Sequence, residues 1–371
     1  MTWAQRIALG RVALRYPRLT LRKLRRRRAP ANRPPAFPPL VQFFLHEGCN
    51  LRCAMCGQWR RSEAAGTGFG KAHLPLAKLT SLIDEAAPHR PEIYVWGGEP
   101  TLHPDFLPFV AHVKRRGLLC TVNTNGTLLG RLAGGILDAG VDSIDVSIDG
   151  PEEVHDAIRG ARGTYRRVMA GLEELRRGGR RRPLVKAVVT LSEANLDGVE
   201  ALLDELDECG GVDMSIVQLG WFVPTEAGRR YERRMRDEFG VAGESWRGFA
   251  DDDSPRRAAR AKALLASIRR RRLRKPILFF PEVDDRSAER YYTHPADTLG
   301  RQGCRAVDLA VDIRPNGDVV ICADFPDLPI GNVNEQTIAE IWNGAARRQL
   351  RDSLRSRGLL GVCPRCCGLF K

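Results

Sequence analysis

Cysteine is the residue type whose spacing says most about the chemistry of this chain. Ten cysteines occur, and eight of them fall into two groups, within 49–56 and within 304–367. The first group is Cys49, Cys53 and Cys56 in the sequence HEGCNLRCAMCGQW. Three thiolates this close together can hold three corners of a [4Fe–4S] cluster, which leaves the fourth iron open to a small molecule. A zinc ion with a distant fourth ligand is the alternative for such spacing.

Apolar runs alternate with amphipathic stretches through the first part of the chain. The run Val41–Leu45 comes directly before the first cysteine group, so the cysteine loop leaves the end of a buried strand. The alternation predicts parallel strands joined by helical crossovers, in too few units for a closed eight-stranded barrel. The expected strands lie near 42–46, 92–96, 118–123, 142–148, 185–191 and 213–219, and the expected helices near 76–87, 104–116, 129–139, 164–178 and 195–209.

Four segments, in this order, resemble the signature motifs of radical S-adenosylmethionine (radical SAM) enzymes. They are Cys49-x3-Cys53-x2-Cys56 after a strand, IYVWGGEPTLHPDF at 93–106, TVNTNGTLL at 121–129 and DSIDVSIDGPEEVHDAIRG at 142–160. The resemblance covers about residues 41–220 and implies an α/β fold, an open partial (β/α)6 barrel of TIM type whose mouth holds the cluster. Met55 is a departure, because the family usually has an aromatic residue there that packs on the adenine. Methionine still offers an apolar, polarisable contact.

The resemblance also implies which residues bind S-adenosylmethionine. The two glycines of the GGE motif let backbone groups approach a ligand closely, and its glutamate offers a carboxylate to the methionine ammonium. Three further residues match family positions that contact the ribose or the methionine carboxylate, which an arginine grips in a bidentate fork. The expected set is Gly97, Gly98, Glu99, Thr124, Ser147, Arg159 and Met55. Asn125 and Asp149 are instead expected to shape turns before the glycines that follow them.

The second cysteine group resembles the auxiliary-cluster domain called SPASM or Twitch in radical SAM enzymes. The segment AVDIRPNGDVVIC at 310–322 predicts a hairpin with Asn316-Gly317 at its turn. The resemblance implies a small cysteine-rich α+β domain that holds one auxiliary [4Fe–4S] cluster. The expected ligands are Cys304, Cys322, Cys363 and Cys366. Cys367 could replace Cys366, and structural zinc is the alternative metal.

Charge is unevenly distributed along the chain. Residues 1–40 hold 11 basic and no acidic residues, and residues 255–275 hold ten basic and no acidic residues, which leaves a mildly acidic remainder. This pattern is not that of a uniformly basic nucleic-acid binder, and no clear nucleic-acid-binding motif occurs. The expected division is a basic arm with a proline-rich linker at 1–40, the barrel at 41–220, a connecting region that sets substrate specificity at 221–303, and the auxiliary domain at 304–371. In the connecting region Asp284 or Asp285 is a candidate base, although exposed turn carboxylates are commoner.

The arm predicts an amphipathic helix with Trp3, Ile7 and Leu14 on one face, broken near Pro17. Such a helix can lie on an anionic membrane surface or bind an acidic partner, and a partly disordered arm is the alternative. No run approaches the ~18 apolar residues of a membrane span, and no secretory signal is evident. We therefore expect a cytoplasmic protein, with peripheral attachment at the inner membrane surface as the alternative.

The radical SAM resemblance implies the reaction. A reduced [4Fe–4S] cluster, supplied with electrons by a flavodoxin- or ferredoxin-type donor, cleaves S-adenosylmethionine, and the resulting 5′-deoxyadenosyl radical abstracts a hydrogen atom from the substrate. The expected substrate is a peptide or protein, the commonest role that the SPASM resemblance implies. Radical oxidation or rearrangement of a small molecule, such as a sugar, alcohol or lipid precursor, is one alternative. A non-enzymatic, zinc-bearing binding protein is the other.

Overall fold

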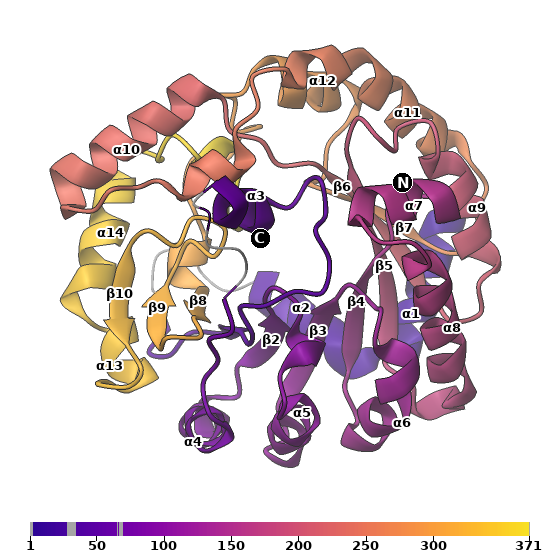
Figure 1. The fold of residues 1–371 in the computed structure, drawn as a ribbon, viewed down its shortest axis with the longest axis horizontal. Coiled ribbons are helices and arrows are strands. Elements are labelled where there is room, and N and C mark those ends of the chain that lie inside the picture. The colour runs from indigo at the N-terminus through magenta and orange to yellow at the C-terminus, as the bar shows by residue number, and fades with distance from the viewer. Residues whose placement is uncertain (1–2, 28–34, 65, 67–69, 371) are drawn as a thin grey trace.

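A single curved sheet of ten strands is the framework of the molecule (Figure 1). The computed structural model describes residues 3–27, 35–64, 66 and 70–370. The strand order is β10-β9-β8-β1-β2-β3-β4-β5-β6-β7, and the strands from β8 to β7 run parallel. The strands are β1 (Leu40–Phe44), β2 (Glu92–Trp96), β3 (Leu119–Thr124), β4 (Ser143–Ser147), β5 (Leu184–Leu191), β6 (Met214–Leu219), β7 (Ile277–Phe280), β8 (Ala310–Ile313), β9 (Asp318–Val320) and β10 (Pro329–Asn332).

Helices line the outer side of the sheet, and helices within residues 225–293 span the gap between its two edges (Figure 1). Five of the barrel helices match the predicted spans within about two residues, except that the last begins at 199 instead of 195, and the helices at 57–64 and 152–159 were not predicted. The helices are α1 (Trp3–Arg15), α2 (Pro17–Arg27), α3 (Gly57–Ala64), α4 (Leu76–Ala86), α5 (Phe106–Arg115), α6 (Leu129–Ala139), α7 (Glu152–Arg159), α8 (Thr164–Arg177), α9 (Val199–Glu208), α10 (Thr225–Phe239), α11 (Ala258–Arg270), α12 (Asp285–Thr293), α13 (Ile338–Trp342) and α14 (Ala345–Ser356).

The predicted partial barrel is confirmed, and it is wider than its six predicted strands. β1 to β6 lie where the apolar runs placed them, within about two residues. β7 adds a parallel strand beside β6, and β8 adds another on the far side of β1, with Leu40 opposite Ala310. The predicted hairpin is confirmed as β8 and β9, which pair antiparallel. The cysteine-rich C-terminal region is therefore continuous with the barrel sheet.

Apolar side chains at strand and helix periods build the core between sheet and helices. Every residue of β1 is buried, as expected of a parallel strand covered on both faces. On α5 the buried residues are Phe106, Phe109, Val110 and Val113, the i, i+3, i+4, i+7 pattern of one helix face. This packing fixes the strand ends, and with them the loops that carry the site.

The basic arm forms two helices that cover the amino-terminal ends of the barrel strands. The break near Pro17 is confirmed, because α2 begins there. Leu19 packs against Leu184 and Met214, the first residues of β5 and β6. The Gln5 side chain accepts a 2.8 Å hydrogen bond from the backbone N–H of Ile277. The side chain of Trp3 and residues 28–34 of the linker lie outside the described residues.

Candidate active site

One cavity contains every residue expected to bind the first cluster or S-adenosylmethionine. It opens at the carboxyl ends of the parallel strands and has a volume of about 440 Å³. Its wall includes the three loop cysteines and all seven expected S-adenosylmethionine contacts: Cys49, Cys53, Cys56, Met55, Gly97, Gly98, Glu99, Thr124, Ser147 and Arg159. Residues from four strand ends thus meet in one space, which is where parallel α/β barrels place their active sites.

The cysteine loop presents its sulfur atoms together with hydrogen-bond donors. The backbone N–H of Leu51 lies 3.4 Å from Cys49 Sγ, and that of Trp59 lies 3.4 Å from Cys56 Sγ. Burial raises the pKa of Cys49 to about 12. A thiolate so placed is stable only beside a metal ion, whose binding displaces the proton. One buried sulfur (Cys53) and two half-buried ones (Cys49 and Cys56), with N–H donors toward the latter two, fit an iron–sulfur cluster.

Gly97 and Gly98 are required by the cysteine loop itself. The backbone N–H of Gly98 donates a 2.9 Å hydrogen bond to the carbonyl of His46. A Cβ at Gly98 would lie 2.4 Å from the carbonyl oxygen of Gly48, and Gly97 has a φ of +153°. We expected these glycines to admit a ligand. They line the cavity, but the contact that excludes a side chain is with the backbone of the loop that carries Cys49.

The Glu99 carboxylate is fully buried and ties the second strand end to the third. It accepts hydrogen bonds from Thr124 Oγ1 at 2.7 Å, from the backbone N–H of Asn125 at 2.7 Å, and from Thr101. Burial raises its pKa, although these hydrogen bonds oppose the shift. The expected role toward a methionine ammonium stays a prediction. The protein contacts show that Glu99 also fixes the turn at Thr124 and Asn125.

Arg159 and Asp149 form a buried ion pair against the cysteine loop. One terminal nitrogen of Arg159 pairs with Asp149, and the other donates to Cys53 Sγ at 3.6 Å. Burial lowers the pKa of Arg159, but Asp149 and Cys53 outweigh it and leave the pKa above its ordinary value. Asp149 also accepts a 3.0 Å hydrogen bond from the backbone N–H of Thr190. Our expectation that Asp149 merely shapes a turn was wrong, because it orients the arginine.

Asn125 is a second residue whose role the sequence understated. It shapes the predicted turn, since its Oδ1 accepts from the backbone N–H of Thr127 at 3.0 Å. Its Nδ2 also donates to Asn50 at 2.8 Å and lies 3.9 Å from Cys49 Sγ. The side chain therefore joins the third strand end to the cysteine loop. Its place directly after Thr124, in NTNG, was the available signal.

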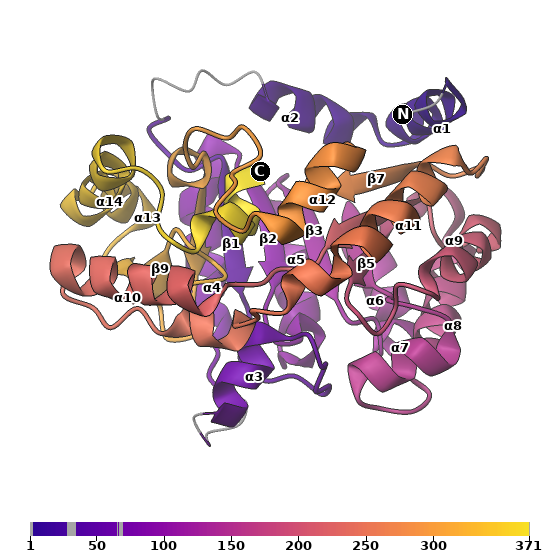
Figure 2. The same ribbon diagram turned by 90° about the horizontal axis from the view of Figure 1, so that it is seen from above.

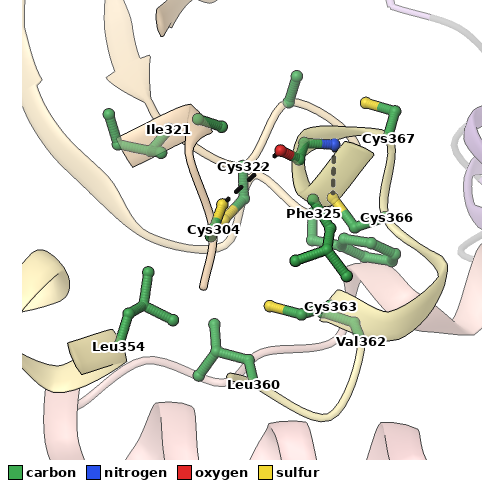
Figure 3. A pocket seen from close by; sticks show the side chains of 14 residues that line it. Cys304, Ile321, Cys322, Phe325, Leu354, Leu360, Val362, Cys363, Cys366 and Cys367 are labelled. Carbon is green, nitrogen blue, oxygen red and sulfur yellow. Dashed lines mark hydrogen bonds between the residues drawn. The ribbon is translucent and has the colours of Figure 1, made fainter. Parts of the chain in front are cut away.

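The second cysteine group surrounds a small cavity of its own (Figure 3). The thiols of Cys304, Cys322, Cys363 and Cys366 face the centre of this cavity, and Cys367 lies at its upper edge in Figure 3. Apolar side chains complete the wall, including those of Ile321, Phe325, Leu354, Leu360 and Val362. Burial raises the pKa of Cys363 to about 12. An apolar chamber with four thiols facing its centre and a fifth at its edge fits a second iron–sulfur cluster.

Asp324 connects the two cavities, and we did not single it out from the sequence. Its carboxylate, Cys366 Sγ and Cys367 Sγ lie within 4.8 Å of one another. The same residue lines the large cavity that holds the first cysteine group. Only its position two residues after Cys322 could have indicated this role.

The connecting region contributes part of the wall of the large cavity. Trp221, Phe249, Asp251, Arg257 and Tyr292 line it. The two candidate bases, Asp284 and Asp285, are not among the described residues that line this cavity.

Asp284 caps α12 by accepting a 2.7 Å hydrogen bond from the backbone N–H of Ser287, and Asp285 pairs with Arg269. These contacts fit the commoner explanation that both are exposed carboxylates, and they do not support the alternative of a base at either position.

Comparison with known proteins identifies the family. The model of the radical SAM superfamily matches residues 44–206, and the model of the SPASM iron–sulfur cluster-binding domain matches residues 304–367. The chain belongs to the radical SAM superfamily and carries a C-terminal SPASM domain. It is an enzyme that uses S-adenosylmethionine and a [4Fe–4S] cluster. Its SPASM domain binds auxiliary iron–sulfur. The alternative of a non-enzymatic zinc protein is thereby excluded.

Individual relatives of this radical SAM protein act on different substrates. The AdoMet-dependent heme synthase of Methanosarcina barkeri is 28% identical over 349 residues, which cover 88% of each chain. The PqqA peptide cyclase of Gluconobacter oxydans is 27% identical, covering 83% of this chain and 77% of the relative. Streptococcus suis SuiB bound to S-adenosylmethionine shares the fold, with a TM-score of 0.61, 16% identity, and coverage of 90% of this chain and 73% of SuiB.

Proposed function

We propose that the large cavity cleaves S-adenosylmethionine and abstracts a hydrogen atom from a peptide substrate bound between the cysteine loop and Asp324. The observation that carries the proposal is that all ten expected cluster and S-adenosylmethionine residues line one cavity. When bound there, the reduced cluster and S-adenosylmethionine supply a 5′-deoxyadenosyl radical.

The protein's own residues hold and orient these groups. We propose Cys49, Cys53 and Cys56 as ligands of the first cluster. Arg159, held by Asp149, would place its guanidinium beside Cys53 and toward the methionine carboxylate. Glu99 would face the methionine ammonium while keeping the third strand end in register.

Thr124 and Ser147 would contact the ribose, and Met55 the adenine. Trp221, Phe249 and Tyr292 would exclude water from the mouth.

The auxiliary site would lie next to the part of the cavity wall that carries Asp324. We propose Cys304, Cys322, Cys363 and Cys366 as its ligands. Asp324 would place a carboxylate between this site and the substrate, within reach of a proton released during substrate oxidation. A small flavodoxin or ferredoxin would supply the electron for the first cluster.

The charge of the cavity wall favours a peptide. Beyond the S-adenosylmethionine contacts, the wall offers three carboxylates and two guanidinium groups, from Glu193, Asp251, Asp324, Arg60 and Arg257. Side-chain amides of Gln58 and Gln218 add donors and acceptors. A peptide presents both donors and acceptors to such a wall. A precursor of heme is the second candidate, favoured by the 28% identity to a heme synthase.

An anaerobic assay with dithionite and S-adenosylmethionine tests the reaction. The native protein should form 5′-deoxyadenosine, Cys53→Ala should not, and Cys209→Ala, outside both cavities, should behave like the native protein. Absence of product from native protein with both clusters loaded would contradict the proposed reaction.

The substrate class needs a separate measurement. A low-molecular-mass extract of the source cells should stimulate 5′-deoxyadenosine formation, and protease treatment of the extract should remove the stimulation. Stimulation that survives protease treatment would contradict a peptide substrate and favour a small molecule such as a heme precursor.

A further inference from the structure

We propose that the outer face of α1 and α2 docks this protein on an anionic membrane surface. This face, called the arm face below, consists of Arg6, Ile7, Arg11, Leu14, Arg18, Leu21 and Leu24, all exposed. The proposal concerns a region remote from the cavity and does not depend on the identity of the substrate.

Exposed aliphatic side chains are concentrated on the arm face. Among the described residues, four large hydrophobic side chains are exposed, and all four belong to α1 and α2. Leu14 is 84% exposed, Leu21 55%, Leu24 46% and Ile7 37%. A cluster of this kind on an otherwise polar surface marks an interaction site.

The inner face of the two helices shows that the exposed leucines are not needed for folding. Tyr16 donates its hydroxyl to Asp213 at 3.1 Å and to the carbonyl of Pro183 at 3.2 Å. Gln5 holds β7 through Ile277, and Leu19 is buried against β5 and β6. The arm is therefore anchored to the barrel by one face and free to bind through the other.

Arginines interleave with the exposed aliphatic residues. In α1, Ile7, Arg11 and Leu14 follow at i, i+4 and i+7, which is one helix face. No ion pair within 4.0 Å involves Arg6, Arg11 or Arg18 among the residues that the structure describes. The sequence offers no acidic residue before position 40. This surface therefore keeps its positive charge for a partner.

Neighbouring loops extend the positive surface. Arg15 donates to the carbonyl of Gly179, and the exposed Arg180 and Arg181 follow directly. Arg22 donates to the carbonyl of Arg90, which is also exposed. These arginines add positive charge next to α1 and α2.

The second basic segment is a useful contrast, because its charges are used inside the protein. Arg260 of α11 pairs with Glu193 and Asp197, and Arg271 pairs with Glu200 and Asp204. The acidic residues around α9 neutralise that segment. Within the part of the chain that the structure describes, Arg6, Arg11 and Arg18 form no such ion pairs, so an external anionic partner is the better match.

A lipid bilayer fits both components of the arm face at once. Leucine and isoleucine can enter the acyl boundary while the interleaved arginines remain at anionic headgroups, as in interfacial amphipathic helices. A nucleic acid would use the arginines but leave the leucines in water.

Figure 2 shows α1 and α2 on the side of the molecule opposite α3, which follows the cysteine loop. Docking through the arm face would therefore leave the cavity mouth facing away from the membrane.

Vesicle flotation with the full chain tests the proposal. We expect binding to phosphatidylcholine vesicles that contain about one-third phosphatidylglycerol, and weak binding to pure phosphatidylcholine. Binding should fall about fivefold for each of Arg6→Gln, Arg11→Gln and Arg18→Gln, and it should fall as salt increases. Leu14→Ser with Leu21→Ser should reduce it about tenfold or more. A control that removes Arg230, Arg233 and Arg256, three exposed arginines elsewhere, should bind like the native protein.

Three results would overturn the proposal. The first is equal binding to both vesicle types. The second is loss of binding in the control as large as in the arm variants. The third is no vesicle binding together with a Leu14-dependent dimer or a Leu14-dependent complex with an oligonucleotide. Circular dichroism and 5′-deoxyadenosine formation should be unchanged in the leucine variants, which separates this test from that of the enzymatic function.

Discussion

Arg159 donates to the sulfur of Cys53 at 3.6 Å, across 106 positions of sequence. The arginine ends α7 and the cysteine lies in the loop after β1, so the contact joins two segments that only the barrel brings together. Asp149 holds the other side of the guanidinium. A charge fixed beside a cluster ligand can both position a ligand carboxylate and stabilise a thiolate.

Removing Asp149 should be costly for folding. Asp149→Ala would leave Arg159 buried without its ion-pair partner, and we expect a loss of about 3–5 kcal/mol in the free energy of unfolding. Urea denaturation of the metal-free protein measures this loss. Glu152→Ala, which breaks the exposed pair with Arg166, should cost less than about 1 kcal/mol. An equal loss of unfolding free energy in the two variants would contradict the expected contribution of the buried Asp149–Arg159 ion pair.

Gly98 should control loading of the first cluster. Gly98→Ala places a Cβ against the backbone of the cysteine loop and should displace Cys49 and its neighbours. We expect iron after anaerobic reconstitution to fall from about eight to about four atoms per chain, because the auxiliary site remains. Gly134→Ala is the matched control, since α6 has open space there, and it should keep all its iron. Full iron content in Gly98→Ala would contradict the role given to this glycine.

The choice between Cys366 and Cys367 can be made by iron analysis. Cys366 is buried and its Sγ accepts a 3.3 Å hydrogen bond from the backbone N–H of Gly368, a donor suited to a cluster ligand. Cys366→Ala should therefore lose about four irons per chain, whereas Cys367→Ala should lose none. The reverse result would exchange the two residues in the ligand set.

His155 should make the fold sensitive to acid. Burial lowers its pKa from 6.5 to about 3, and its Nδ1 accepts a 3.1 Å hydrogen bond from the backbone N–H of Asp149. Between these values the unfolded imidazole binds a proton and the folded one does not, so falling pH favours the unfolded chain. The contribution of His155 to stability should drop by about 2 kcal/mol from pH 7 to pH 5.

Urea denaturation at both pH values checks this pH dependence. His155→Gln should be less stable at pH 7 but lose correspondingly less stability on acidification, and the exposed His294→Gln should retain the native pH dependence. An unchanged dependence in His155→Gln would contradict the assignment.

The strands that build the barrel were predictable because each is a buried apolar run with a regular helical neighbour. β7 was not, since its four residues form a short, half-buried run after a segment dominated by arginine. The pairing of β8 with β1 was also hidden, because a register between Leu40 and Ala310 leaves no trace in local spacing.

For the functional site, too, local patterns were predictable and long-range contacts were not. Residue types that can bind metal or carboxylate were recognisable from their motifs, whereas roles that depend on a distant partner were not. Asp149 and Asn125 look like turn residues locally, and only the fold brings them to Arg159 and Cys49. Asp324 acquires its place between two cavities through Cys366 and Cys367, which lie more than forty positions away.

The central claim is that the iron not bound by Cys49, Cys53 or Cys56 binds S-adenosylmethionine. Electron–nuclear double resonance tests it on the reduced Cys304→Ala, Cys322→Ala protein, in which the first cluster is the only paramagnet expected. Added S-adenosylmethionine labelled with nitrogen-15 in its amino group should give a nitrogen coupling to the cluster. A fully loaded cluster whose spectrum is unchanged by the labelled compound would contradict the account.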